Sequence, residues 1–293
     1  MRVTQLMLSG NMQRYLSRSY ERLGDIQEKL MTGKKIVRPS DDPVVAMKGM
    51  TYRSNLTEIE QYQRNLSEAF TWIESADSAL EHATSVLHRA RELIVQIKNG
   101  TYGAEDRQAV KKEIEQLKED LVSVANTQVA GKYIFNGTDI LSQPVDPATA
   151  TPTATPGRNA SFTVEVAKGI RLPVNVDPDN VFDATLFNTF KNIEVDLQAN
   201  NTANLDQYLS ELTQHLGKVV DERAELGARM NRLELVQERL SKQEVIANKN
   251  ISDNEDADME RIITDLKTQE SVHRAVLGVG ARIIQPTLLD FLR

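Results

Sequence analysis

The sequence predicts a mainly α protein, a long antiparallel helical rod or bundle formed by its N- and C-terminal halves, with a small β-containing insert at the centre. Three observations support this fold class. Apolar residues recur alternately four and three positions apart near both ends, which is typical of helices that pack on one another. A proline-, threonine- and alanine-rich stretch separates the two halves and is followed by alternating apolar residues. Aromatic residues make up only 5% of the 293 positions, which favours a thin helical core.

The first predicted helix has one apolar face that a single serine interrupts. Gly33 follows this face and can adopt the left-handed conformation that ends a helix. Asp42 is a suitable N-cap and Pro43 a suitable first helical residue, so a second helix is predicted to begin there. The first face consists of Met12, Leu16, Ser19, Leu23, Ile26 and Leu30.

The second helix, from Pro43 to about Lys98, carries the strongest periodic signal in the chain. Leucines and isoleucines recur every seven residues, and a row of alanines recurs at the same interval beside them. Small residues at fixed heptad positions allow a partner helix to approach closely, while the larger row fills the seam. The larger row is Ile59, Leu66, Ile73, Leu80, Leu87 and Ile94, and the alanines are Ala69, Ala76, Ala83 and Ala90.

The central insert follows a third helix, whose apolar positions run from Val110 to Val124. Residues 133–137 are predicted to form a short strand that runs into a turn, and the prolines of 143–157 indicate a mobile loop. Alternating apolar residues over 162–176 predict a β-hairpin. A short helix is expected over 186–197, where apolar residues return to helical spacing.

A fourth long helix is predicted from Leu205 to Leu240, because nearly every position of its four–three pattern is apolar. The polar residues 248–258 are predicted to separate it from a last helix, Met259 to Ile284. An apolar tail, 288–292, closes the chain. Chain ends are normally polar and frayed, so the tail is interpreted as a surface buried on assembly, with docking on its own domain as the alternative.

These elements divide the chain into five predicted segments. They are an N-terminal assembly helix (1–42), the first half of a helical rod (43–140), an outer insert (141–200), the second half of the rod (201–250) and a C-terminal assembly helix (251–293). The seam of the rod is predicted where the second and fourth helices meet. Its residues are Leu66, Ile73, Leu80, Leu87, Ile94, Leu212, Leu216, Leu226, Met230 and Leu233.

The sequence offers no residue set for catalysis, for a cofactor or for a metal ion. The chain has no cysteine, which excludes disulfides, thiol catalysis and cysteine-ligated metals. His82 and His88 are six positions apart and would not share a helix face as a metal pair does. The acidic stretch 252–258 lacks the glycine and the final glutamate of a calcium loop. We therefore expect a structural protein, not an enzyme.

The charge and hydropathy of the chain argue against two classes of partner. A net charge of −7 does not favour nucleic acid. No apolar run reaches 18 residues, so no membrane insertion is expected. The first ten residues show no basic-then-apolar leader. If the protein leaves the cell, we expect it to be secreted without a cleaved signal peptide.

Two stretches of the chain resemble the signatures of the bacterial flagellin family. Residues 30–36 (LMTGKKI) and 39–43 (PSDDP) are similar to the N-terminal signature of that family. Residues 223–233 (RAELGARMNRL) are similar to its C-terminal counterpart, and the ending at 288–293 is similar too. Within the family, the motif GKYIFNG at 131–137, together with the MRVT opening and the proline after the two aspartates, favours the hook–filament junction branch.

The resemblance implies a fold in which paired termini form an inner tubular layer and the long helices form a second, rod-like layer. It implies export in an unfolded state through the flagellar type III export apparatus, aided by a cytosolic chaperone, and a final location on the flagellum outside the cell. The implied partners are hook-associated protein 1, flagellin and further copies of the chain in a ring. A filament-forming or minor flagellin is the alternative, and an enzyme carried on the same scaffold is a second.

The terminal helices are expected to be disordered in the monomer and to become ordered by neighbouring copies. Each is too short and too interrupted to be stable alone in water. The predicted N-terminal assembly interface is Leu16, Leu23, Ile26 and Leu30. The predicted C-terminal assembly interface is Ile263, Leu266, Leu277, Ile284, Leu288, Leu289, Phe291 and Leu292.

Overall fold

The computed structural model describes residues 5–98 and 103–284. The chain divides into two compact units. The first, here called the terminal unit, comprises residues 1–58 and 243–293, and the second, the rod unit, comprises residues 59–242. The boundaries fall inside the two longest helices, α2 (Pro43–Lys98) and α6 (Leu205–Glu255), which therefore contribute to both units. This division differs from the five predicted segments, whose boundaries were placed near helix ends.

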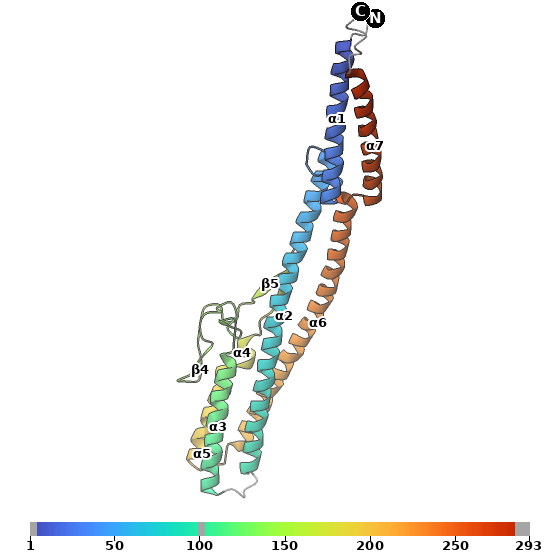
Figure 1. The fold of residues 1–293 in the computed structure, drawn as a ribbon. Helices are drawn as coiled ribbons and strands as arrows, with labels where there is room; N and C mark the ends of the chain where they lie inside the picture. Colours follow the sequence, from blue (N-terminus) through green and yellow to red (C-terminus); the bar gives the residue numbers. More distant parts are fainter. Residues whose placement is uncertain (1–4, 99–102, 285–293) are drawn as a thin grey trace, which may run out of the picture. The chain divides into compact units, whose positions relative to one another are not determined.

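The terminal unit pairs the first and last helices of the chain. Helix α1 (Gln5–Thr32) lies antiparallel beside α7 (Met259–Ile284) (Figure 1). Helix α1 ends at Gly33, whose φ of +67° is accessible to glycine at little cost. The start of α2 is capped by Asp42, whose Oδ1 accepts from the backbone N–H groups of Val44 and Val45 at 3.0 and 3.1 Å. The predicted pairing of the ends and both predicted helix boundaries are confirmed.

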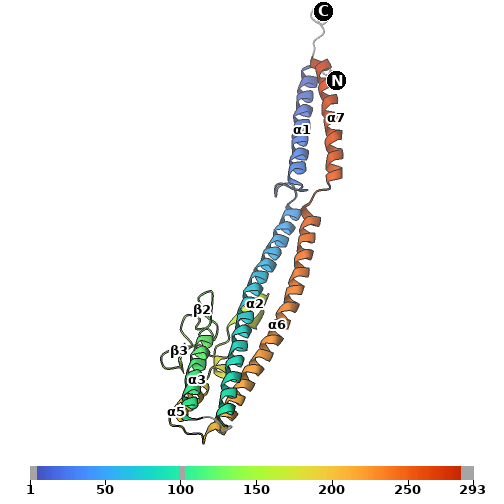
Figure 2. The same cartoon turned by 60° about the horizontal axis from the view of Figure 1, so that its bottom comes forward.

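The rod unit has a continuous apolar core. Helices α2 and α6 run side by side in both views (Figure 1; Figure 2), and α3 (Ala104–Ala125) packs on α5 (Ala184–Gln198). The heptad row of α2 faces inward, with Leu80 and Ile94 fully buried. Of the predicted seam residues, eight are buried, and two are half-buried at the edge of the same core. The buried ones are Leu66, Ile73, Leu80, Leu87, Ile94, Leu212, Leu226 and Leu233, and the half-buried ones are Leu216 and Met230.

The insert between α3 and α5 is built from three small antiparallel sheets. Strand β1 (Gln128–Val129) pairs with β2 (Lys132–Tyr133), and β3 (Val145–Asp146) pairs with β4 (Thr151–Pro152). Strand β5 (Thr163–Ala167) pairs with β6 (Ile170–Pro173), which confirms the predicted hairpin. A one-turn helix, α4 (Pro178–Val181), leads into α5. Strand β3 of the insert contacts α3, and strand β4 contacts α5.

Three local predictions are corrected by the structure. The predicted strand over 133–137 is limited to β2, because Asn136 folds back and donates to the carbonyls of Asp139 and Ser142. The stretch 143–157 is not an irregular loop, since it contains β3 and β4. The side chain of the following Arg158, only 7% exposed, donates to three backbone carbonyls around this stretch. A buried cation with several acceptors fixes the loops that surround it.

The third correction concerns the end of α6. The predicted polar gap at 248–258 shrinks to three residues, because α6 continues to Glu255. Polar residues do not stop a helix when they face solvent and include no glycine or proline. Asp258 caps the next helix, since its Oδ1 accepts from the N–H groups of Glu260 and Arg261 at the start of α7.

Candidate assembly surface

The first part of the candidate surface is the face along which α1 and α7 pair. Both helices present positions spaced four and three apart, and most of these side chains are only half-buried. The most buried side chain of α1 in this face is polar, since Ser19 is 5% exposed. The positions on α1 are Met12, Leu16, Ser19, Leu23, Ile26 and Leu30, and those on α7 are Ile262, Leu266, Gln269, His273, Val276 and Gly280.

The centre of this face is a small hydrogen-bonded cluster. The Oγ of Ser19 lies 3.1 Å from Nδ1 of His273 and accepts from Nε2 of Gln269 at 3.2 Å. Nε2 of Gln269 also reaches the backbone carbonyl of Ser19 at 3.5 Å. The ring of Tyr20 meets the His273 ring edge-on, with centroids 4.4 Å apart. The two terminal helices are therefore joined by specific polar contacts as well as by apolar ones.

The second part of the surface is the joint where both terminal helices meet the long helices. The N–H of Lys35 donates to the carbonyl of Glu255 at 2.7 Å, and the N–H of Ala257 donates to the carbonyl of Gly33 at 2.9 Å. Nζ of Lys34 lies 2.6 Å from Oδ1 of Asp256. These contacts tie the segment after α1 to the segment before α7. The lysine lowers the pKa of the Asp256 carboxyl, so the pair stays charged well into the acid range.

A buried carboxylate occupies the middle of this joint. The side chain of Glu255 is 7% exposed and lies between two cations, Nη2 of Arg53 at 2.5 Å and Nζ of Lys34 at 3.6 Å. Gly49 of α2 makes room for it, since a Cβ there would press against Oε1 of Glu255. The side chain of Asn254 donates to the carbonyl of Val45 at 3.0 Å. A buried charge of this kind is stable only while its partners are in place.

The family-like motif between α1 and α2 is thereby explained in physical terms. Oδ2 of Asp41 accepts from the N–H groups of Val37 and Arg38, which closes the turn after α1, and these bonds lower the pKa of its carboxyl. Asp42 caps α2, and Gly33 ends α1. The motif therefore specifies the path of the chain between the two helices.

Sequence reasoning missed the central residues of the joint. It found neither Gly49 nor Arg53. It noted Glu255 only as part of an acidic cluster opposite in charge to the basic residues 1–38, and left pairing of the two segments and solvated faces as alternatives. The available signal was Gly49, a glycine inside an otherwise good helical pattern, because such a residue marks a close approach of another group. It also placed no weight on Gln269 or Gly280 in α7.

The third part of the surface is its outward-facing apolar side chains. Most of the large apolar side chains that are exposed in the described residues belong to the terminal unit, although the rod unit is the longer one. Soluble monomers rarely gather so much apolar surface without a partner for it. These side chains are Met7, Tyr15, Tyr20, Met31, Val44, Met47, Met50, Val245, Ile246, Met259, Ile263, Val272, Leu277 and Val279.

The predicted C-terminal interface residues are distributed over more than one face. Leu266 lies on the face that pairs with α1, whereas Ile263 and Leu277 are 43% and 45% exposed and lie on the open side of α7. Ile284 is the last residue of α7, and its side chain is outside the described residues. The predicted tail residues Leu288, Leu289, Phe291 and Leu292 also lie outside the described residues.

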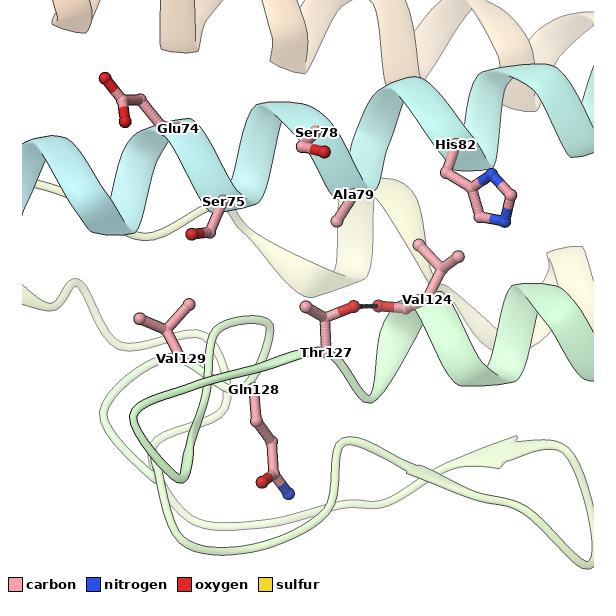
Figure 3. Close-up of a pocket in the computed structure, with 9 residues that line it drawn as sticks. All are labelled: Glu74, Ser75, Ser78, Ala79, His82, Val124, Thr127, Gln128 and Val129. Atoms are coloured by element: carbon pink, nitrogen blue, oxygen red, sulfur yellow. Dashed lines mark hydrogen bonds between the residues drawn. The ribbon is translucent and has the colours of Figure 1, made fainter.

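The rod unit has an open hollow of about 530 Å³ between α2 and the end of α3 (Figure 3). Ser75 and His82 of α2 point toward it, whereas Gln128 turns away from α2. The Thr127 hydroxyl donates to the carbonyl of Val124 at 2.7 Å, so it completes the end of α3. The lining combines scattered polar groups with no buried charge, and it presents no catalytic arrangement. Within 5–98 and 103–284, no group of three or more His, Asp or Glu side chains could hold a metal ion.

None of the described helices combines the length and the apolar character that a bilayer span requires.

Two family models match the chain over its two helical halves. One, described as the bacterial flagellin N-terminal helical region, matches residues 3–140, and the other, the bacterial flagellin C-terminal helical region, matches residues 209–292. The chain belongs to the bacterial flagellin family. Flagellin-family and hook-associated proteins are structural, so the chain is a structural component of the bacterial flagellum and not an enzyme.

Individual relatives come from both branches of the family. The chain is 26% identical to flagellar hook-associated protein 3 of Escherichia coli strain K12, over 93% of each chain. It is 28% identical to a flagellin of Listeria monocytogenes, over 88% of this chain and 87% of that one. Among solved structures, FlgL of Bacillus cereus is 25% identical with a TM-score of 0.60, covering 69% of this chain and 99% of that chain.

Hook-associated protein 3 of Legionella pneumophila shares the fold with a TM-score of 0.61 at 16% identity, covering 70% of this chain and 98% of that chain. The resemblance read from the motifs at both ends is thus confirmed by whole-chain comparison.

Proposed function

We propose that this chain is a junction adaptor that joins the hook to the filament of the bacterial flagellum. In this role it contacts hook-associated protein 1 on one side and flagellin on the other, and it forms a ring of copies. The observation that carries the proposal is the similarity to a hook-associated protein 3 over 93% of both chains. The GKYIFNG motif at 131–137 adds to it.

The placement of apolar groups supports an assembly role for the terminal unit. The rod unit buries its own core, whereas the terminal unit leaves Met31 and the α2 residues Val44, Met47 and Met50 exposed. Such side chains lose contact with water only when another chain covers them. A protein that must pack into a flagellum needs such a surface, and one that acts alone does not.

Assembly is proposed to be coupled to folding of the ends. The roughly 80 terminal residues cost about 1–2 kcal/mol each in backbone entropy when they become ordered. The half-buried face between α1 and α7 offsets only part of this cost, and burial against neighbouring copies supplies the rest. This favours little assembly in free solution and strong assembly on an existing template.

The route to the flagellum belongs to the same proposal. The chain is exported unfolded, without a cleaved signal peptide, through the flagellar type III apparatus, and a cytosolic chaperone covers its C-terminal helix beforehand. The absence of cysteine suits such a route, since no disulfide can form and block threading. Exposed apolar residues on α7, such as Val272 and Leu277, suit a chaperone that shields this helix.

The decisive experiment is the position of the protein on isolated flagella. Immuno-electron microscopy is expected to place it in a single band between hook and filament. Labelling along the filament would contradict the adaptor role and favour a filament-forming flagellin, an alternative that the similarity to a Listeria flagellin keeps open.

Mixing purified chain with short filament seeds separates the same two functions in vitro. An adaptor is expected to add a terminating layer at the seed ends. Long self-extension would indicate a filament protein instead.

Removal of residues 284–293 tests the tail. The shortened chain is expected to fold, because the rod unit is untouched. Cells that carry it are expected to lose motility and to release flagellin into the medium. Filaments that form normally would show that the tail is not an assembly element. Deletion of the predicted insert, 141–200, is a poorer test, because it would also remove α5, which packs on α3.

A further inference from the structure

The apolar pattern of α1 and α7 does not by itself fix the register in which the two helices pair. Both helices repeat the same four–three spacing, and most of the positions are apolar. A repeat of this kind allows one helix to slide by a heptad and still meet apolar side chains. In antiparallel pairs, therefore, the apolar pattern alone does not determine which residues face each other.

The hydrogen-bonded cluster at the middle of the face distinguishes between these registers. Ser19 is 5% exposed and is contacted by two polar side chains of α7, Gln269 and His273. The amide nitrogen of Gln269 can only donate, so the Ser19 hydroxyl accepts from it and is left free to donate to Nδ1 of His273 in the tautomer that carries its proton on Nε2. Every polar atom of the Ser19 side chain is satisfied in this arrangement.

A second, independent feature matches the same alignment. Gly280 of α7 lies against Met12 of α1, and a Cβ at Gly280 would stand 2.8 Å from the Met12 Cε. The largest flexible side chain of the α1 face thus meets the one position of the α7 face that has no side chain. The same antiparallel offset places Leu16 opposite Val276 and Leu30 opposite Ile262.

We propose that Ser19, Gln269 and His273 are the register-determining residues of the terminal helix pair, with Met12 and Gly280 as a second steric key. A slip by one heptad that places Leu23 opposite Val276 would also place His273 opposite Ile26 and Gln269 opposite Leu30. The buried Ser19 would then lose both of its polar partners. Leaving such groups without partners is penalised strongly. A single polar layer is known to set the register of coiled helices at some cost in stability.

This inference rests on the proposed function and names the residues that restrict α1 and α7 to a single pairing register. An adaptor whose ends paired in several registers would offer neighbouring copies several different surfaces. The inference rests on pairing of α1 with α7 and not on the identity of the flagellar partners.

The test uses cysteine pairs in the purified full chain, which has no cysteine of its own. Leu16→Cys with Val276→Cys reports the observed register, and Leu23→Cys with Val276→Cys reports a register displaced by one heptad. Under mild oxidation at low protein concentration, the first pair is expected to form its intramolecular disulfide at least about tenfold faster, because disulfides require close Cβ atoms. Even if the ends open and close in solution, oxidation traps the register in which they close.

The polar layer is then replaced by Ser19→Ala, Gln269→Leu and His273→Leu in both cysteine backgrounds. The two oxidation rates are expected to come within about threefold of each other, since an apolar face permits both registers. The remaining contact of Met12 with Gly280 involves a flexible side chain, which adapts to either register at little cost. Ser17→Ala, at an exposed position two residues away on α1, is the matched control and is expected to keep the original preference.

A triple variant that keeps the tenfold preference overturns the proposal, as does a parent chain without one. If the triple variant aggregates, Gln269→Leu alone removes one donor and is expected to give an intermediate ratio. An unchanged ratio in that variant contradicts the proposal too. The assay needs no flagellum, so a failure here is distinct from a failure of the adaptor role, which microscopy tests.

Discussion

The rod unit and the terminal unit share two helices but differ in how far their apolar side chains are buried. Among the described residues, every buried apolar side chain except Ala247 belongs to the rod unit. In the terminal unit the apolar side chains are half-buried or exposed, and its best buried groups are polar, namely Ser19 and Glu255. One part of the chain completes its own core, and the other forms its contacts around polar anchors.

This difference teaches where the free energy of each unit comes from. Burying a leucine or isoleucine contributes about 1.5–3 kcal/mol, so the heptad row of α2 alone accounts for a large share of rod stability. The terminal unit depends on hydrogen bonds and ion pairs, whose net contributions are smaller. The rod is therefore expected to fold by itself, and the ends to depend on what surrounds them.

Protease sensitivity should separate the two units most clearly. Limited proteolysis of dilute monomer is expected to remove both ends and leave a stable fragment near residues 45–250, because cleavage follows local opening. Mass spectrometry of the products would locate the cuts. Protection of both ends at the same protease dose would break the comparison, since it would mean that the terminal unit is stable alone.

The core of the rod should respond strongly to a single truncation. Leu80 is fully buried in the heptad row, and Leu80→Ala is expected to lower the free energy of unfolding by about 2–5 kcal/mol. Ile263→Ala on the open side of α7 is the matched change, since Ile263 is 43% exposed, and it should alter monomer unfolding by less than about 0.5 kcal/mol. Urea unfolding followed by circular dichroism measures both. Equal losses would refute the contrast.

Two glycines offer a finer test within the terminal unit. Gly49→Ala would place a methyl group against the Glu255 carboxylate, so it is expected to destabilise the joint by about 1–3 kcal/mol. Gly24→Ala, in the open on α1, is expected to stabilise its helix by up to about 1 kcal/mol. Amide hydrogen exchange near Ala257 and within α1 reports the two effects. If both alanines stabilise, the close approach at Gly49 does not exist in solution.

The smallest expected effect concerns a buried carboxyl in the rod. Burial raises the pKa of Glu222, and the amide of Asn180, which donates to its Oε1 at 2.7 Å, opposes the shift only in part. A raised folded pKa means that protonation stabilises the fold, so this contribution is lost as the pH rises through that pKa. Glu222→Gln is expected to stabilise the chain at pH 7 by less than about 1 kcal/mol.

The gain from Glu222→Gln should fade as the pH falls through the raised pKa, because the native side chain then becomes neutral as well. Thermal unfolding measured between pH 4 and 8 checks this sign. A gain that grows toward acid pH would show that the carboxyl is stabilised in its charged form.

The helices and the inward face of α2 could be predicted from sequence because each depends on local spacing. The heptad of Leu80 and Leu87 gave the inward face of α2 correctly, and Gly33 and Asp42 marked helix ends through their own backbone chemistry. On α6 the pattern was less reliable. Its buried row includes His215 and Glu222, which apolar spacing alone cannot find.

The anchors of the terminal unit could not be predicted, because they depend on contacts between residues more than 200 positions apart. Arg53 meets Glu255 across the chain, and no spacing rule links them. The same holds for Ser19 and Gln269. Nor does composition reveal that Arg158 organises the insert, since its acceptors are backbone carbonyls of several loops.

The backbone bridge between Lys34 and Asp256 brings the exit from α1 and the entry to α7 to the same place. Helices α1 and α7 can consequently be exchanged together, with one junction after residue 34 and another before residue 256. Chimaeras of that kind can be made between family members that take different positions along one flagellum. They would reveal whether the exchanged terminal helices or the rod unit determine the position at which a protein is incorporated.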